Sequence, residues 1–325
     1  MNNAKVSILL ATYNGQPYLS EQLESIFQQT CSDFWLYVRD DHSSDETIKI
    51  IAHYFDAPER IRVHDSLGRL GLVGNFSRLL EAACQDRGEY FLLGDQDDVW
   101  YPNKLADQLL LMQVLEEKYP GQPLLIHSDM EVVDSSLNQI HPSFMEYQNI
   151  RNEDRESLKV LLTQNFVTGC TVLVNRRLLD IALPIPGDAL THDWWLALCA
   201  VTFGHIGYID RPLLRYRQHG SNEIGAKSIR NHLNPLKVNW WKHWLKGRNH
   251  LLQSMGQAHA LAERIKEHDP ENENLKLIGS YASLLTLPWW QRIRQLKRDN
   301  IHYQSRLRHC LMLSRLLSFP RQTDG

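Results

Sequence analysis

Short apolar runs alternate with helical patterns along the first 120 residues of the chain. Four runs have the length and the composition of buried strands: Val6–Leu10, Trp35–Val38, Ile61–Val63 and Tyr90–Leu93. Apolar residues at helical spacing predict helices over 17–30, 45–54, 75–84 and 104–118. This alternation predicts an α/β domain with a Rossmann-like, mainly parallel sheet that helices cover on both faces.

The composition changes near Gly225. Residues up to that point contain 18 Lys and Arg against 31 Asp and Glu, whereas the rest of the chain contains 17 against 7 and has the tryptophan, leucine and basic residues of helices. We therefore expect an acidic α/β domain over 1–225 and a basic helical extension over 226–325.

The cysteines and the apolar runs bear on location. Five cysteines, an odd number with no CxxC pair, argue against a disulfide framework or a thiolate zinc site and favour the reducing cytoplasm. No apolar run approaches the roughly 18 residues of a membrane-spanning helix, and the first run is too short for a signal peptide. We therefore expect a cytoplasmic protein.

Three aspartates follow the fourth predicted strand, in "GDQDDVW". Ligands of open α/β sheets bind at the carboxyl ends of the strands, where these residues lie. Asp95, Asp97 and Asp98 could present oxygens to one divalent cation such as Mg²⁺ or Mn²⁺, which could hold a diphosphate. The alternative is a solvated acidic turn that caps a helix beginning near Pro102.

Two further aspartates, Asp40 and Asp41, follow the second predicted strand, in "RDDHSSDET". A carboxylate at Asp41 could accept the N3 proton of a pyrimidine base. Ser43 and Ser44 resemble the start of a helix, so part of this motif is interpreted as capping.

Two later motifs also carry candidate chemistry. Asp193 lies between His192 and two tryptophans in "THDWW", where it could accept a proton in a closed site; the alternative is a helix start whose tryptophans enter the core. His219, beside Arg215 and Arg217 in "RYRQH", suits a diphosphate and its metal, unless this segment is only a surface loop.

Together and in this order, the motifs resemble family 2 glycosyltransferases of the GT-A fold, from Val6 to about Asn222. "VSILLATYNG" resembles the opening strand and nucleotide loop, and "GLVGNFSRLLEAA" the segment that lines the sugar-nucleotide pocket. "GDQDDVWYPNKL" is similar to the metal-binding DxD motif of bacterial rhamnosyltransferase-like members. "THDWW" is similar to the acidic base motif, with His192 in place of the usual glutamate.

The resemblance implies a role for each matching residue on the donor side. Thr12, Tyr13 and Asp41 would hold the nucleoside, with Asp41 at the edge of the base. Asn75 would line the donor pocket, and Asp95 would contact the ribose or the sugar.

It also implies a metal-dependent, inverting transfer. Asp97, with Asp98 and His219, would bind Mn²⁺ or Mg²⁺, and Asp193 would deprotonate the acceptor hydroxyl. The donor would be a dTDP- or UDP-sugar, with L-rhamnose as the first choice of sugar. The acceptor would be a saccharide, lipid-linked in many family members, in the synthesis of a surface polysaccharide such as O-antigen or lipopolysaccharide.

Other functions are open from the residues alone. A sugar-phosphate nucleotidyltransferase would share the sheet and the metal, but "ATYNGQPYL" lacks the glycine-rich basic loop that such enzymes carry. A noncatalytic carbohydrate- or metal-binding module would not need Asp193. Only the basic extension suggests nucleic acid, and it has no recognition motif, so no nucleic-acid partner is expected.

The basic extension itself has two interpretations. Its tryptophans, leucines and cations are typical of helices that lie in a membrane interface, here an anionic surface. Alternatively, it is a helical subdomain packed on the acidic domain.

Overall fold

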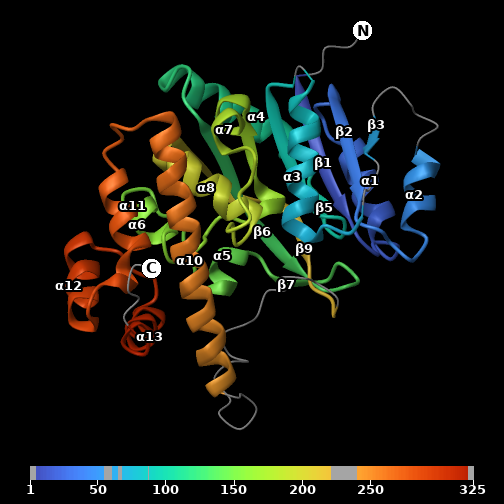
Figure 1. The fold of residues 1–325 in the computed structure, drawn as a ribbon. Helices are drawn as coiled ribbons and strands as arrows, with labels where there is room; N and C mark the ends of the chain where they lie inside the picture. Colours follow the sequence, from blue (N-terminus) through green and yellow to red (C-terminus); the bar gives the residue numbers. More distant parts are fainter. Residues whose placement is uncertain (1–4, 55–60, 65–67, 87, 221–239, 321–325) are drawn as a thin grey trace.

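The computed structural model describes residues 5–54, 61–64, 68–86, 88–220 and 240–320 (Figure 1). The expected domain boundary at residue 225 lies outside these ranges.

One nine-stranded sheet forms the centre of the molecule. Strands β3, β2, β1 and β4 run parallel, as do β6 and β9, whereas β8, β7 and β5 pair antiparallel with their neighbours. The mainly parallel GT-A-type sheet predicted from the sequence is therefore confirmed. The strand order is β3 (Ile61–His64), β2 (Phe34–Asp40), β1 (Val6–Thr12), β4 (Tyr90–Gly94), β8 (Leu173–Asn175), β6 (Leu124–Val133), β9 (His205–Arg217) and β5 (Val99–Trp100), with β7 (Gln139–His141) beside β6.

Helices cover both faces of the sheet because its central strands are apolar on both sides. In β1, Leu9 and Ala11 face one hydrophobic cluster, and Ile8 and Leu10 face the other, as the twofold repeat of a strand requires. The second cluster is closed by α1 (Leu19–Phe27), α2 (Thr47–Tyr54) and α4 (Lys104–Lys118). The first is closed by α3 (Gly71–Cys84), α6 (Ser157–Leu161), α7 (Arg176–Ala182) and α8 (His192–Phe203).

Two helix starts differ from those predicted. Helix α3 begins at Gly71, four residues before Asn75, because its first turn is held by an aspartate distant in sequence, described below. Helix α2 begins at Thr47, and the carboxylate of Asp45 accepts its backbone N–H at 3.0 Å, so this aspartate rather than Ser43 or Ser44 caps the helix.

The C-terminal helices pack on the α8 side of the molecule (Figure 1). Their buried residues, among them Leu251, Leu261 and Tyr281, belong to the same hydrophobic cluster as α3 and α8, so these helices pack against the helices that cover the sheet. None of the helices in the described ranges is both long and apolar enough to cross a membrane. The remaining helices are α10 (Trp240–His268), α11 (Leu275–Ala282), α12 (Trp289–Asp299), α13 (Arg306–Leu317), the short α5 (Phe144–Gln148), and 3₁₀ turns at Gly169–Thr171 and Leu284–Thr286.

A buried histidine makes the stability of this fold depend on pH. His127 lies in β6, where all residues are buried, and its Nε2 is 3.1 Å from Oδ1 of Asn152. Burial lowers the pKa of His127 to about 4, below the value of about 6.5 in an unfolded chain. Between these values the unfolded chain binds a proton that the folded chain does not, so the contribution of His127 to stability is lost as pH falls.

We expect this histidine alone to lower the free energy of unfolding by about 1.4 kcal/mol for each pH unit from 6 to 4.5. Urea unfolding of the wild type and of His127→Asn across this range measures the difference, because the variant retains every other titrating group. Parallel pH profiles for the two proteins would contradict it.

Candidate active site

A pocket of about 790 Å³ opens at the carboxyl ends of β1, β2 and β4. Its other walls come from residues 144–150, residues 165–169, the start of α8, and helices α10 and α13. Polar groups from distant parts of the sequence therefore meet where a parallel sheet places its ligands. Seven of the nine predicted site residues line this pocket: Thr12, Tyr13, Asp41, Asn75, Asp95, Asp97 and Asp193.

Asp41 connects the end of β2 to the start of α3. Its carboxylate is 3% exposed and accepts the backbone N–H groups of Leu70 at 2.7 Å and Gly71 at 2.8 Å, together with the guanidinium of Arg39 at 3.1 Å. The first N–H groups of a helix have no partner within it, so a carboxylate there stabilises the helix start. Asp41 thus has a structural role in addition to the predicted contact with the base.

The neighbouring polar residues are also held in place. Asn75 accepts from Arg39 at 3.0 Å and donates to the Arg39 carbonyl at 3.2 Å, and the buried hydroxyl of Thr12 donates to Asp40 at 2.9 Å. The Tyr13 ring is 36% exposed, and the guanidinium of Arg69 lies 4.1 Å from its centre. The sequence did not identify Arg69 as a residue of the site, because it follows a stretch with no strand or helix pattern.

The side chains of Asp97 and His219, which the sequence assigned to the same site, are in contact. Oδ2 of Asp97 lies 2.8 Å from Nε2 of His219, although the residues are 122 positions apart. The side chains are 15% and 10% exposed, and the His219 ring lies 4.6 Å from that of Tyr18. His219 does not itself line the pocket but lies directly behind Asp97, so the alternative of a plain surface loop is wrong.

Asp98 lies beneath the pocket rather than on its wall. It is fully buried, its Oδ1 accepts the backbone N–H of Arg217 at 3.3 Å, and possible ligand atoms of Asp95, Asp98 and Cys170 lie within 4.8 Å of one another. Burial and the charges of Asp97 and Asp95 raise the pKa of Asp98 well above its usual value. The metal role of Asp98 stays a prediction.

The turn "GDQDDVW" is not a solvated cap of the next helix. Helix α4 begins at Lys104, after Asn103, and no side chain caps it. Trp100 is buried, and its backbone N–H donates to the hydroxyl of Ser25 on α1 at 3.0 Å. The turn is therefore anchored in the core directly after its last aspartate.

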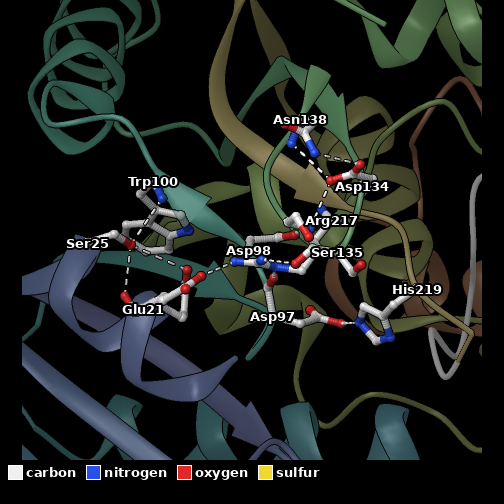
Figure 2. A network of polar contacts seen from close by, with 12 residues as sticks. Glu21, Ser25, Asp97, Asp98, Trp100, Asp134, Ser135, Asn138, Arg217 and His219 are labelled. Atoms are coloured by element: carbon white, nitrogen blue, oxygen red, sulfur yellow. Dashed lines mark hydrogen bonds and ion pairs between the residues drawn. The ribbon is translucent and has the colours of Figure 1, made fainter. Parts of the chain in front are cut away.

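Arg217 fixes the backbone of this turn (Figure 2). Its side chain is 2% exposed; Nε donates to the Asp97 carbonyl at 2.9 Å, Nη1 donates to the Ser135 carbonyl at 2.8 Å, and Nη2 pairs with the carboxylate of Glu21 on α1. The Arg215 side chain pairs with Glu131 at 3.2 Å. Arg215 and Arg217, the neighbours of His219 in "RYRQH", therefore both bind protein groups.

Asp193 opens α8 and faces the pocket. Its Oδ2 accepts the N–H of Gly169 at 2.9 Å, and its Oδ1 accepts the N–H of Trp194 at 2.7 Å, so backbone donors orient both oxygens. Trp194 and Trp195 are buried, as the helix-start interpretation predicted. The tryptophans therefore enter the core and the aspartate lines the pocket, while the role of Asp193 as a base stays a prediction.

His192 occupies the position of the usual glutamate and lines the same pocket. Its ring is 3% exposed and stacks on Phe76 with centroids 3.9 Å apart, and neither ring nitrogen has a hydrogen-bond partner in the described structure. Burial lowers the pKa of His192, so the neutral imidazole is favoured.

Comparison with known proteins identifies relatives of this arrangement. The family model described as "Glycosyl transferase family 2" matches residues 7–181. The dTDP-rhamnosyl transferase RfbG of Shigella flexneri is 26% identical over 309 residues, which cover 90% of this chain and 96% of RfbG. An uncharacterized glycosyltransferase of Rickettsia prowazekii is 25% identical over 91% of this chain and 92% of its own length.

Solved structures share the fold. Residues 1–349 of TarS from S. aureus, in complex with UDP-GlcNAc, superpose with a TM-score of 0.53 at 17% identity, covering 96% of this chain and 87% of that one. The mannosyltransferase PcManGT from Pyrobaculum calidifontis, in complex with GDP-Man and Mn²⁺, gives a TM-score of 0.54 at 16% identity, covering 95% and 78%. These likenesses extend through the C-terminal helices.

The two partners of the Arg217–Glu21 ion pair should differ in how much they contribute to stability, because only Arg217 is buried. We expect Arg217→Met to lower the free energy of unfolding by about 3 kcal/mol, because two buried carbonyls lose their donor. Glu21→Gln should cost less than about 1 kcal/mol, since the Glu21 side chain is 53% exposed. Urea unfolding of both variants measures this, and equal losses would contradict it.

Proposed function

Since the chain belongs to glycosyl transferase family 2 and is a glycosyltransferase of the GT-A fold, we propose that it transfers L-rhamnose from dTDP-rhamnose to a saccharide acceptor. The transfer inverts the anomeric centre and serves the synthesis of a bacterial surface polysaccharide such as O-antigen. The similarity to RfbG along nearly the whole chain supports the choice of donor. Family membership sets aside the nucleotidyltransferase and binding-module alternatives.

One observation carries this proposal: a single pocket gathers the candidate nucleoside, metal and base residues. The end of β1 and the start of α3 supply Thr12 and Asn75, the turn after β4 supplies Asp97, and α8 supplies Asp193. A noncatalytic sugar site would not require a carboxylate oriented by two backbone donors beside an acidic turn.

The acidic turn suits a divalent cation. Asp95 and Asp97 offer carboxylate oxygens at the pocket, and His219 offers an imidazole nitrogen next to Asp97. Mn²⁺ binds both kinds of ligand atom, whereas Mg²⁺ binds the oxygens. When bound, such a cation neutralises the charge that grows on the departing diphosphate. We propose Asp97 and His219 as its main protein ligands, with Asp95 directed to the ribose or the sugar and Asp98 as a further ligand.

The remaining chemistry belongs to the side chains of the pocket. Tyr13, beneath Arg69, offers a ring on which a base can stack, and Asp41 lies at the edge of that base. Asp193 accepts the proton of the acceptor hydroxyl as the hydroxyl oxygen attacks the anomeric carbon from the face opposite the diphosphate. Carboxylates are weak bases at neutral pH, so much of the rate comes from orientation, which the N–H groups of Gly169 and Trp194 provide.

Donor binding tests the proposal directly. We expect calorimetry with Mn²⁺ or Mg²⁺ to show metal-dependent binding and slow hydrolysis of dTDP-rhamnose, in preference to UDP- and GDP-sugars. Binding of no nucleotide sugar in the presence of metal would remove the proposed function. Preference for another nucleotide sugar would change only the donor.

Two conservative variants should separate binding from transfer. Asp97→Asn removes a charge from the metal site, so metal-dependent donor affinity should fall at least tenfold. Asp193→Asn keeps an oxygen that can accept from Gly169 but is no longer a base, so donor affinity should stay within about twofold while transfer falls by about 100-fold or more. Loss of donor binding in Asp193→Asn would reassign this residue to structure.

The proposed location is the cytoplasmic face of an anionic membrane. Trp241 is 69% exposed, Trp289 is 60% exposed and Trp290 is 44% exposed, all on the basic C-terminal helices. Exposed tryptophans beside cations are typical of interface binding, to which each cation adds about 1 kcal/mol. A lipid-linked acceptor would be found at such a surface.

We expect the full chain to sediment with vesicles of anionic phospholipid and the double variant Trp241→Ala/Trp289→Ala to sediment several-fold less. Leu110→Ala is the matched control, because Leu110 is 63% exposed on α4, on the other face of the sheet. Equal sedimentation of all three proteins would exclude membrane binding through these tryptophans.

A further inference from the structure

The pocket has a basic wall that lies beyond the part of the chain matched by the family model. Lys246 and His250 of α10 and Arg308 of α13 line the pocket, whereas the family match ends at residue 181. None of these residues belongs to the donor and base machinery described above. Their chemistry is that of an anion site, because Lys and Arg are the usual partners of phosphate groups.

The basic wall is on the side of the candidate base. The His250 ring lies 5.3 Å from the ring of Trp194, the residue that follows Asp193. On α13, Nη2 of Arg308 lies 3.5 Å from the carbonyl of Gln148, which also lines the pocket. The predicted nucleoside residues stand instead at the ends of β1 and β2 and on α3. The basic wall therefore shares the pocket with Asp193 and adjoins the first turn of α8.

The cations of this wall differ in their partners from the buried arginines of the site. Within the described ranges, neither Lys246 nor Arg308 makes an ion pair with a carboxylate, unlike Arg39, Arg215 and Arg217. Burial and the charges of Arg315 and Lys246 lower the pKa of His250, as expected where cations gather without an anion. Bringing two cations to one pocket costs free energy unless a ligand supplies the opposite charge.

We propose that Lys246 and Arg308 bind a phosphate or diphosphate ester of the acceptor, close to the hydroxyl that Asp193 deprotonates. This inference rests on the proposed function and deepens it by assigning the acceptor's chemical class. The donor's own diphosphate is assigned to the acidic turn, so the basic wall serves a second anion. The acceptor is then selected by charge near the reacting sugar as well as by the sugar itself.

The test fills the donor site first. Wild-type protein saturated with dTDP and Mn²⁺ is titrated in a calorimeter with inorganic diphosphate, glucose 1-phosphate and geranyl diphosphate as separate probes. We expect at least one phosphate ester to bind, and Lys246→Ala and Arg308→Ala each to weaken that binding by about tenfold, the worth of one charged hydrogen bond. Arg308→Lys should restore part of the affinity.

The controls separate the possible failures. Arg306→Ala removes an exposed cation two residues away on the same helix, outside the pocket lining, and should leave probe binding unchanged. Unchanged dTDP affinity in all variants shows that they fold. Binding of glucose 1-phosphate alone indicates a phosphorylated saccharide, and preference for geranyl diphosphate indicates a lipid-linked acceptor. If no probe binds while dTDP does, the basic wall is not an anion site; if neither dTDP nor UDP nor GDP binds, the proposed function fails first.

Discussion

The buried guanidinium of Arg217 is the interaction on which the geometry of the site depends. It joins α1, the β6–β7 turn and the acidic turn after β4, three segments that no strand pairing holds together at this point. The carboxylates of the acidic turn repel one another, and a flexible loop would let them separate into solvent. A hydrogen bond from one buried cation to the backbone of the turn keeps Asp97 at the pocket and leaves its side chain available to His219.

A similar arrangement holds the side of the pocket that we propose for the nucleoside. Arg39 contacts both Asp41 and Asn75, and Asp41 in turn holds the N-terminus of α3. In both places a buried arginine that does not itself line the pocket supports residues that do, and so determines where these residues lie. Preorganisation of this kind lowers the cost of ordering polar groups when a ligand binds.

The sequence predicted the parts of the molecule that follow local rules. Apolar runs identified β1, β2, β3 and β4, and aspartates after these strands pointed to one edge of the sheet, because strand and side-chain periodicities are local properties. The early start of α3 was missed because Asp41, thirty residues earlier, supplies the cap. The contacts of Arg215 and Arg217 could not be predicted for the same reason: their partners Glu131 and Glu21 come from other elements, and no spacing in the sequence indicates such contacts.

The shared hydrophobic core of the C-terminal helices constrains how this enzyme can diversify. Leu251, Leu261 and Tyr281 pack in the same cluster as α3 and α8, so these helices cannot be exchanged as a unit without refitting the interior of the catalytic half. Lys246 and Arg308 face the pocket from these helices and lie outside that cluster. Substitutions at these two positions can therefore change the wall of the pocket without refitting the interior.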